Sequence, residues 1–222
     1  MRRLLIFLLA AAVLTSCATT RFYAGFTPES AADEMALLQP VSHQFYLDGR
    51  GNESYSDSLS VVSEDLMTSL TPAIGVPVNC TIPLDSLQRE EAAAFMAYIA
   101  AHDRQKAGEF AIPSALDDLL EDSGYRYGLV LYADGTSRDV GDYIGNAAFG
   151  IGLGILTTIL TMGMVTLYTY PTPHVSFMYA AVLDSQTDRI VFYNLREYED
   201  LDTTSEKSVR KQLSRLLKDF RR

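Results

Sequence analysis

Apolar and polar residues follow the periods of helices and strands over most of residues 27–220. Residues 127–133 (YGLVLYA) are a nearly unbroken apolar run, which predicts a central strand. Residues 175–183 and 189–197 have strand-like patterns on either side of the turn residues 184–188, and this arrangement predicts a β-hairpin. We expect the hairpin and the central strand to share one sheet.

Other segments carry helical spacing or helix-capping residues. Thr27 is a good N-cap with Pro28 in the first turn, and Pro40 stops the segment. Thr203 and Glu206 form a capping box ahead of the last amphipathic helix. The expected helices cover residues 27–38, 54–70, 85–106, 113–122 and 203–220, and further strands cover 41–47 and 76–82, the second at a sheet edge because of Pro77 and Pro83.

The order of these elements, without an internal repeat, predicts one α/β or α+β domain. We expect a mixed sheet of about four or five strands with flanking helices, plus a Gly-rich apolar insert that is helical or a hairpin. The residues expected on buried helix faces are Tyr55, Leu59, Val62, Leu66 and Leu70; Leu87, Phe95, Met96 and Ile99; and Val209, Leu213, Leu216, Leu217 and Phe220.

The amino-terminal pattern is different. Arg2 and Arg3 precede an apolar run at residues 4–14, and its 11 residues are too few for a spanning helix, which needs about 20. The run ends in Leu14, Thr15, Ser16 and Cys17, which resembles the lipobox of bacterial lipoproteins.

The resemblance implies that residues 1–16 are a lipoprotein signal peptide, cleaved before Cys17 after a diacylglycerol is attached to its sulfur. Residues 17–26 would then be a lipidated tether, residues 27–222 the envelope domain, and the lipid bilayer a partner. The alternatives are a plain secretory signal or a short amino-terminal anchor. Ala18 after the cysteine resembles outer-membrane rather than inner-membrane lipoproteins, which implies a periplasm-facing location on the outer membrane.

The net charge and the cysteine content argue against certain partners and sites. The formal charge is -10, and loss of Arg2 and Arg3 with the signal lowers it to -12, so nucleic acid is a poor partner. With Cys17 acylated, Cys80 is the remaining thiol, which excludes an internal disulfide and a cysteine metal site. Its apolar surroundings predict a buried cysteine.

An uncharged stretch of 31 residues separates Asp142 from His174. Its Gly-rich apolar part at residues 143–170 is open to three interpretations: a membrane-spanning helix, a buried core segment, or a glycine-jointed excursion that dips into the bilayer or packs against another copy. We favour the excursion. The residues expected to contact membrane or a second copy are Tyr143, Gly150, Gly154, Thr158, Thr161 and Tyr168.

Catalytic and metal-binding patterns are absent from the sequence. His43, His102 and His174 have no second ligand at metal-site spacing, which predicts no metal site and no cofactor. Asp134, Asp139 and Asp142 could bind a cation, but a solvated acidic loop is the favoured interpretation. We therefore expect a non-enzymatic protein.

The last helix is basic against an acidic body. Its cations could meet anionic headgroups or an acidic partner, but a solvated helix face is the favoured interpretation. The residues are Lys207, Arg210, Lys211, Arg215, Lys218, Arg221 and Arg222.

Two longer segments carry a second resemblance. Residues 119–133 (LLEDSGYRYGLVLYA) read as a helix feeding a strand, and residues 179–193 (YAAVLDSQTDRIVFY) as strand, turn and strand. This order resembles small periplasmic lipoproteins related to the amino-terminal domain of the Tol-Pal translocation protein, and also the periplasmic domain of the curli-export lipoprotein. The turn departs from the family, which usually has Gly where this chain has Asp188. The resemblance implies interaction or assembly in the envelope.

The function expected from the sequence is therefore that of a membrane-anchored, non-enzymatic envelope lipoprotein with an interaction or structural role. Residues 143–170 would dock on the membrane or mediate self-association, with a homo-oligomer or an envelope protein as partner. The alternative is a component of an envelope export or transport assembly.

Overall fold

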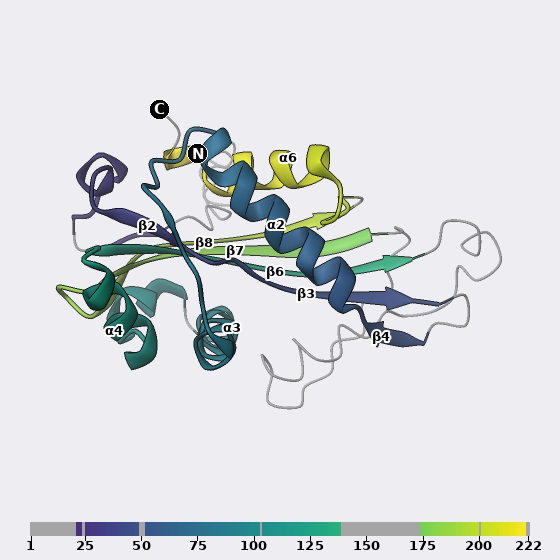
Figure 1. Ribbon diagram of the computed structural model, residues 1–222, viewed down its shortest axis with the longest axis horizontal. Helices are drawn as coiled ribbons and strands as arrows, with labels where there is room; N and C mark the ends of the chain where they lie inside the picture. The colour runs from purple at the N-terminus through teal and green to yellow at the C-terminus, as the bar shows by residue number, and fades with distance from the viewer. Residues whose placement is uncertain are drawn as a thin grey trace, which may run out of the picture.

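The computed structural model describes residues 21–23, 25–48, 52–102, 104–138, 174–199 and 201–220. They form one mixed α/β domain with helices on both faces of a single sheet (Figure 1), as expected from the sequence. The strands are β1 (Arg21–Phe22), β2 (Met35–Leu38), β3 (Val41–Leu47), β4 (Glu53–Tyr55), β5 (Thr81–Ile82), β6 (Tyr127–Arg138), β7 (His174–Asp184) and β8 (Arg189–Glu199). The helices are α2 (Asp57–Ala73), α3 (Ser86–Ala101), α4 (Ser114–Ser123) and α6 (Glu206–Leu216), with 3-10 turns η1 (Pro28–Ala31), η2 (Arg104–Glu109) and η4 (Lys218–Phe220).

Strand β6 lies at the centre of the sheet and pairs with neighbours on both sides. It pairs antiparallel with β7 from Tyr127 opposite Asp184 to Ser137 opposite His174, and β7 continues into the antiparallel β7–β8 hairpin. On its other side β6 pairs in parallel with β2 and then with β3. The predicted central strand, the hairpin and their common sheet are confirmed.

Two cores lie on opposite faces of the sheet, because successive residues of a strand point to opposite sides. Helices α2 and α6 cover one face, and α3 and α4 cover the other (Figure 1). On β6, Leu129 and Leu131 face the first core, whereas Val130 and Tyr132 face the second. The expected apolar face of the last helical segment is confirmed, since Val209, Leu213 and Leu216 of α6, its C-cap Leu217 and Phe220 of η4 are all buried.

The predicted helix over 27–38 is wrong beyond its first turn. Thr27 does cap a short turn through a reciprocal capping box with Ser30, but the chain then extends into β2. Every residue of β2 is fully buried between the two helical layers. An apolar run buried on both faces has no alternation, so its pattern does not separate a strand from a helix.

Helix α2 forms as predicted, but its buried face differs from the prediction. Tyr55 lies before the helix and is exposed, Val62 is 42% exposed, and polar Ser60 and Glu64 point inward. The reason is the adjacent edge of β3: Ser60 Oγ accepts the Gln44 amide at 3.0 Å, and Glu64 Oε1 accepts the Ser42 amide at 2.9 Å. Side chains of α2 therefore replace a neighbouring strand where β4 does not reach.

A buried polar layer explains a second difference, at the last helix. Ser205 is the N-cap of α6, and Thr203 instead donates its hydroxyl to Gln44 Oε1 at 2.5 Å. Gln44 Nε2 donates in turn to Ser42 Oγ. The predicted capping box is wrong because the Thr203 hydroxyl bonds to Gln44 in this layer beneath α2 and α6.

The predicted buried face of α3 is mostly correct. Leu87 is exposed, contrary to expectation, whereas Phe95, Met96 and Ile99 are buried as expected.

Within the part of the chain that the structure describes, no helix is both long and apolar enough to cross a bilayer. The Gly-rich insert at residues 143–170 lies outside that part and stays a prediction. The described strands on either side of it, β6 and β7, pair up to Ser137 and His174.

Candidate functional site

The site residues expected from the sequence lie outside the described ranges and stay predictions. This holds for the lipobox (Leu14, Thr15, Ser16 and Cys17) and for Tyr143, Gly150, Gly154, Thr158, Thr161 and Tyr168.

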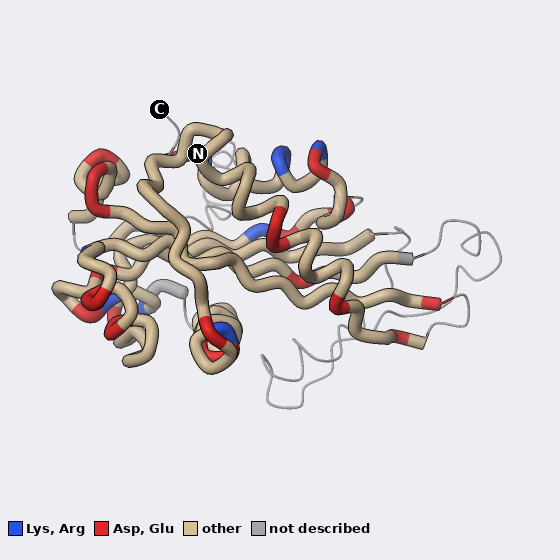
Figure 2. Tube along the Cα trace, in the orientation of Figure 1, with Lys and Arg blue, Asp and Glu red and all other residues tan. Residues whose placement is uncertain are grey.

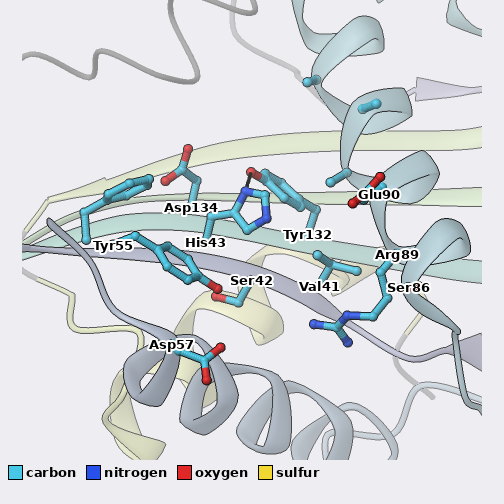
Figure 3. A pocket seen from close by; sticks show the side chains of 14 residues that line it. Val41, Ser42, His43, Tyr55, Asp57, Ser86, Arg89, Glu90, Tyr132 and Asp134 are labelled. Carbon is cyan, nitrogen blue, oxygen red and sulfur yellow. Dashed lines mark hydrogen bonds between the residues drawn. The ribbon is translucent and has the colours of Figure 1, made fainter.

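The structure instead brings together polar and aromatic side chains in a cleft of about 500 Å³ on the α3 face of the sheet (Figure 3). Its floor consists of residues of β3 and β6, including His43, Tyr132 and Asp134. Helix α3 supplies one wall, and Tyr55, at the end of β4, lies on the other side. Figure 3 shows His43 between Asp134 and Tyr132, with Arg89 on the α3 side.

Strand register creates this floor from distant parts of the chain. In the parallel β3–β6 pair, Val41 lies opposite Tyr132 and His43 opposite Asp134. Residues two apart on a strand share a face, so all four side chains face α3. The site was not found from the sequence because the predicted strands carried no information on this register.

His43 and Tyr132 form a hydrogen-bonded aromatic pair. A hydrogen bond of 3.0 Å joins His43 Nδ1 and Tyr132 Oη, and the rings lie edge to face with centroids 5.5 Å apart. Burial lowers the pKa of His43; Glu64 opposes this shift and Arg89 adds to it. Burial also raises the pKa of Tyr132. The pair is therefore uncharged at neutral pH and offers hydrogen bonds rather than charge.

Asp134 is the buried acid of the cleft, with 4% of its surface exposed. Burial raises its pKa to about 7, the Glu53 carboxylate adds to the shift, and a hydrogen bond from the Gly135 amide opposes it. The carboxyl group therefore changes charge near neutral pH. The interpretation of Asp134 as part of a solvated loop is wrong, because it lies inside β6; Asp139 and Asp142 lie outside the described residues.

Arg89 enters the cleft with its charge already paired. Its guanidinium donates to Glu64 Oε1, and the Glu64 carboxylate is 9% exposed. The same Glu64 oxygen accepts the Ser42 amide, so one buried carboxylate holds both the β3 edge and the cation of the cleft wall.

The polar groups of the cleft and the exposed thiol complete the chemistry of the described residues. No group of three or more His, Cys, Asp or Glu side chains among them is placed to hold a metal ion. The described hydrogen-bond partner of the His43 ring is the Tyr132 hydroxyl. Cys80, expected to be buried, is exposed at the edge strand β5, so it is not held in the core.

The cations of α6 form a separate surface feature. Figure 2 shows Lys and Arg on this helix, with an acidic residue at its start, and Asp and Glu spread over the rest of the domain. The described members are all exposed, which both interpretations of these cations require: Lys207, Arg210, Lys211 and Arg215 on α6, and Lys218 in η4. Arg221 and Arg222 lie outside the described residues.

No protein-family model matches the chain, and no curated protein matches it. Solved structures with a similar chain course include two PelC dodecamers from Paraburkholderia phytofirmans, each 8% identical. One has a TM-score of 0.43 and covers 91% of this chain and 96% of its own; the other, a substituted form, has 0.42 with 91% and 98%. The LpoB C-terminal domain from Salmonella enterica is 11% identical, with a TM-score of 0.30 and coverage of 79% and 86%.

Proposed function

We propose that this chain is a lipid-anchored lipoprotein of the bacterial envelope that acts by binding and assembly and not by catalysis. One observation carries the proposal: Leu14, Thr15, Ser16 and Cys17 follow a basic start and eleven apolar residues. This combination suits a lipoprotein signal and is too short for a spanning helix. Two or three acyl chains on Cys17 would make the attachment lasting.

The position of the first strand supports a short tether. Arg21 and Phe22 of β1 pair with Tyr193 and Phe192 of β8, so the folded domain begins four residues after Cys17. Four extended residues reach at most about 14 Å. An acylated Cys17 would therefore hold the β1–β8 edge of the sheet close to the lipid surface.

The cleft supports a binding role. It places a neutral His–Tyr pair and a buried carboxyl on the sheet, and these groups can form hydrogen bonds with a ligand. Residues 143–170 provide the second contact in this proposal, with the membrane or with another copy of the chain.

Membrane fractionation tests the anchor. The wild-type protein should partition with membranes and into detergent, whereas Cys17→Ser should keep its signal and lose acylation. Cys80→Ser is the matched control, because Cys80 is exposed and outside the signal, and it should behave as wild type. Wild-type protein in the soluble fraction, or equal behaviour of the two variants, would contradict the proposal.

A second candidate is a component of an export or transport assembly. Val61 and Val62 are neighbouring exposed apolar side chains on α2, and a protein partner would cover them. Cross-linking in cells separates the two candidates. A ring or a stable ladder of partners supports assembly, and isolated monomers count against it. A chain starting at residue 18 that neither oligomerises nor binds liposomes would contradict docking through residues 143–170.

A further inference from the structure

The cleft on the α3 face has walls suited to a positively charged organic group. The rings of Phe45 and Tyr55 meet at a centroid distance of 5.9 Å and an angle of 69°, and Tyr55 meets His43 edge to face at 6.1 Å. Tyr132 continues the aromatic surface on the other side of His43. Aromatic faces attract cations through the negative potential above the ring.

The charges around these rings are unbalanced. Asp57, Glu90 and Asp134 line the cleft, whereas its one lining cation among the described residues, Arg89, is already paired with Glu64. The cleft therefore keeps an excess of carboxylate. His43 does not offset it at neutral pH, because burial lowers the pKa of its imidazole.

Asp134 is the most deeply buried acid of the cleft lining. It is 4% exposed and lies on the cleft floor, and no described side chain donates a hydrogen bond to its carboxyl group, which receives the Gly135 amide. A carboxylate has room for about four such bonds, and an uncompensated one is costly to bury. A cationic ligand would supply a counter-charge to this carboxylate.

Space and access are also present. Helix α3 contributes Ala93, Ala94 and Ala97 to the wall, and these small side chains leave the volume of about 500 Å³ open. This volume lies in the range of small-molecule sites. Tyr55 at the rim is 53% exposed, so the cleft is reached from solvent.

We propose that this cleft binds an organic ammonium group, with the cation against the rings of Tyr55 and Phe45 and its charge paired with Asp134. The proposal depends on the cleft alone and is independent of acylation at Cys17, so the two can fail separately.

Calorimetry on the purified full-length protein tests it with choline as the probe. The matched ligand is the uncharged carbon analogue, in which carbon replaces the quaternary nitrogen at almost the same shape. Choline should bind more tightly by at least about tenfold, because ion pairing with a desolvated carboxylate contributes more than 1.4 kcal/mol. Equal binding of the two ligands, or no binding of either, overturns the proposal.

Variants locate the site. Asp134→Asn should weaken choline binding by about tenfold or more, and Tyr55→Leu by about three- to fivefold, the range of an exposed cation–π contact. Asp65→Asn, at an exposed position on α2 outside the cleft, should bind as wild type. Because Tyr55 is exposed, its replacement leaves the core intact. Unchanged affinity in both cleft variants contradicts the assignment.

The pH dependence gives an independent readout, since choline has a fixed charge. Wild-type affinity should rise by up to about tenfold from pH 6 to pH 8, as Asp134 with its pKa of about 7 ionises, and Asp134→Asn should abolish this rise. A pH dependence that persists in Asp134→Asn counts against the proposal. The charged and titratable groups around the carboxyl are His43 on β3, Glu53 and Tyr55 on β4, Asp57 on α2, Arg89 and Glu90 on α3, and Tyr132 on β6.

The same ammonium chemistry occurs in free amines and in lipid headgroups. Comparing the affinity of glycerophosphocholine with that of choline distinguishes these two sources. We expect it to bind more weakly than choline, because its phosphate would approach Asp57 and Glu90. Tighter binding of glycerophosphocholine would identify a lipid headgroup as the ammonium source, and weaker binding a free amine.

Discussion

Replacing Asp134 with Asn should make the protein more stable at neutral and alkaline pH. Asp134 is buried in β6, and burial raises its pKa to about 7 from an ordinary value of 3.8. Between these two pH values the folded protein holds a proton that the unfolded chain has released. The contribution of Asp134 to the free energy of unfolding is therefore most favourable below about pH 4, and it is lost as the pH rises through 7.

The magnitude follows from the two pKa values. Their difference corresponds to a loss of about 4 kcal/mol once Asp134 is ionised in both states. Part of this loss is already present at pH 5, so the change between pH 5 and pH 8 is about 2–3 kcal/mol. Asn has nearly the same shape and no charge, so Asp134→Asn should remove this slope.

Urea unfolding at pH 5, 6, 7 and 8, followed by circular dichroism, measures the effect. The stability difference between Asp134→Asn and wild type should grow with pH in favour of the variant. The comparison cancels His43, whose lowered pKa gives an opposite slope below pH 6.5 in both proteins. Asp65→Asn, exposed on α2, is the control and should follow wild type. A pH-independent difference, or a variant that is less stable at pH 8, would refute the reasoning.

Three other substitutions test the packing. Glu64→Ala should lower the free energy of unfolding by about 2–3 kcal/mol, measured by urea unfolding, because it leaves the Ser42 amide and the Arg89 guanidinium without their acceptor. Asp188→Gly should raise it by about 0.5–1 kcal/mol, since Asp188 has φ of 56° in the hairpin turn. Gly135→Ala should lower Tm and cost about 1–3 kcal/mol, because the added Cβ would lie 2.7 Å from the Gln44 side-chain oxygen.

Each substitution has a matched control. Glu64→Gln keeps an oxygen for the Ser42 amide and should cost clearly less than Glu64→Ala. Asp188→Ala places a residue without local hydrogen bonding at the same positive φ and should destabilise the turn. Gly135→Ala should cost less in a Gln44→Ala background, which removes the clashing atom. Equal costs within these pairs would contradict the contacts on which they rest.

Sequence patterns predicted correctly those elements whose hydrophobic period fits only a helix or only a strand. Strand β6, the β7–β8 hairpin and the apolar face of α6 were correct, because turn residues and periodicity agree there. Strand β2 was mistaken for helix because its four residues are buried on both faces and show no alternation. The face of α2 was misjudged because Ser60 and Glu64 point inward to bond the β3 edge.

The cleft could not be predicted for a different reason. His43 and Tyr132 are 89 positions apart and meet through the register of two parallel strands, which hydrophobic patterns do not specify. One signal was available: Asp134 directly follows the apolar run 127–133 and is two residues after Tyr132, so in a continued strand the acid lies on the face that carries the tyrosine.

The most direct test of the central claim is the mass of the amino-terminal peptide of the protein purified from bacterial membranes. An anchored lipoprotein should yield a peptide that begins at Cys17 and carries the mass of a thioether-linked diacylglycerol, with or without a further acyl chain on its amino group. A peptide that begins at another residue, or a Cys17 with an unmodified thiol, would contradict the account.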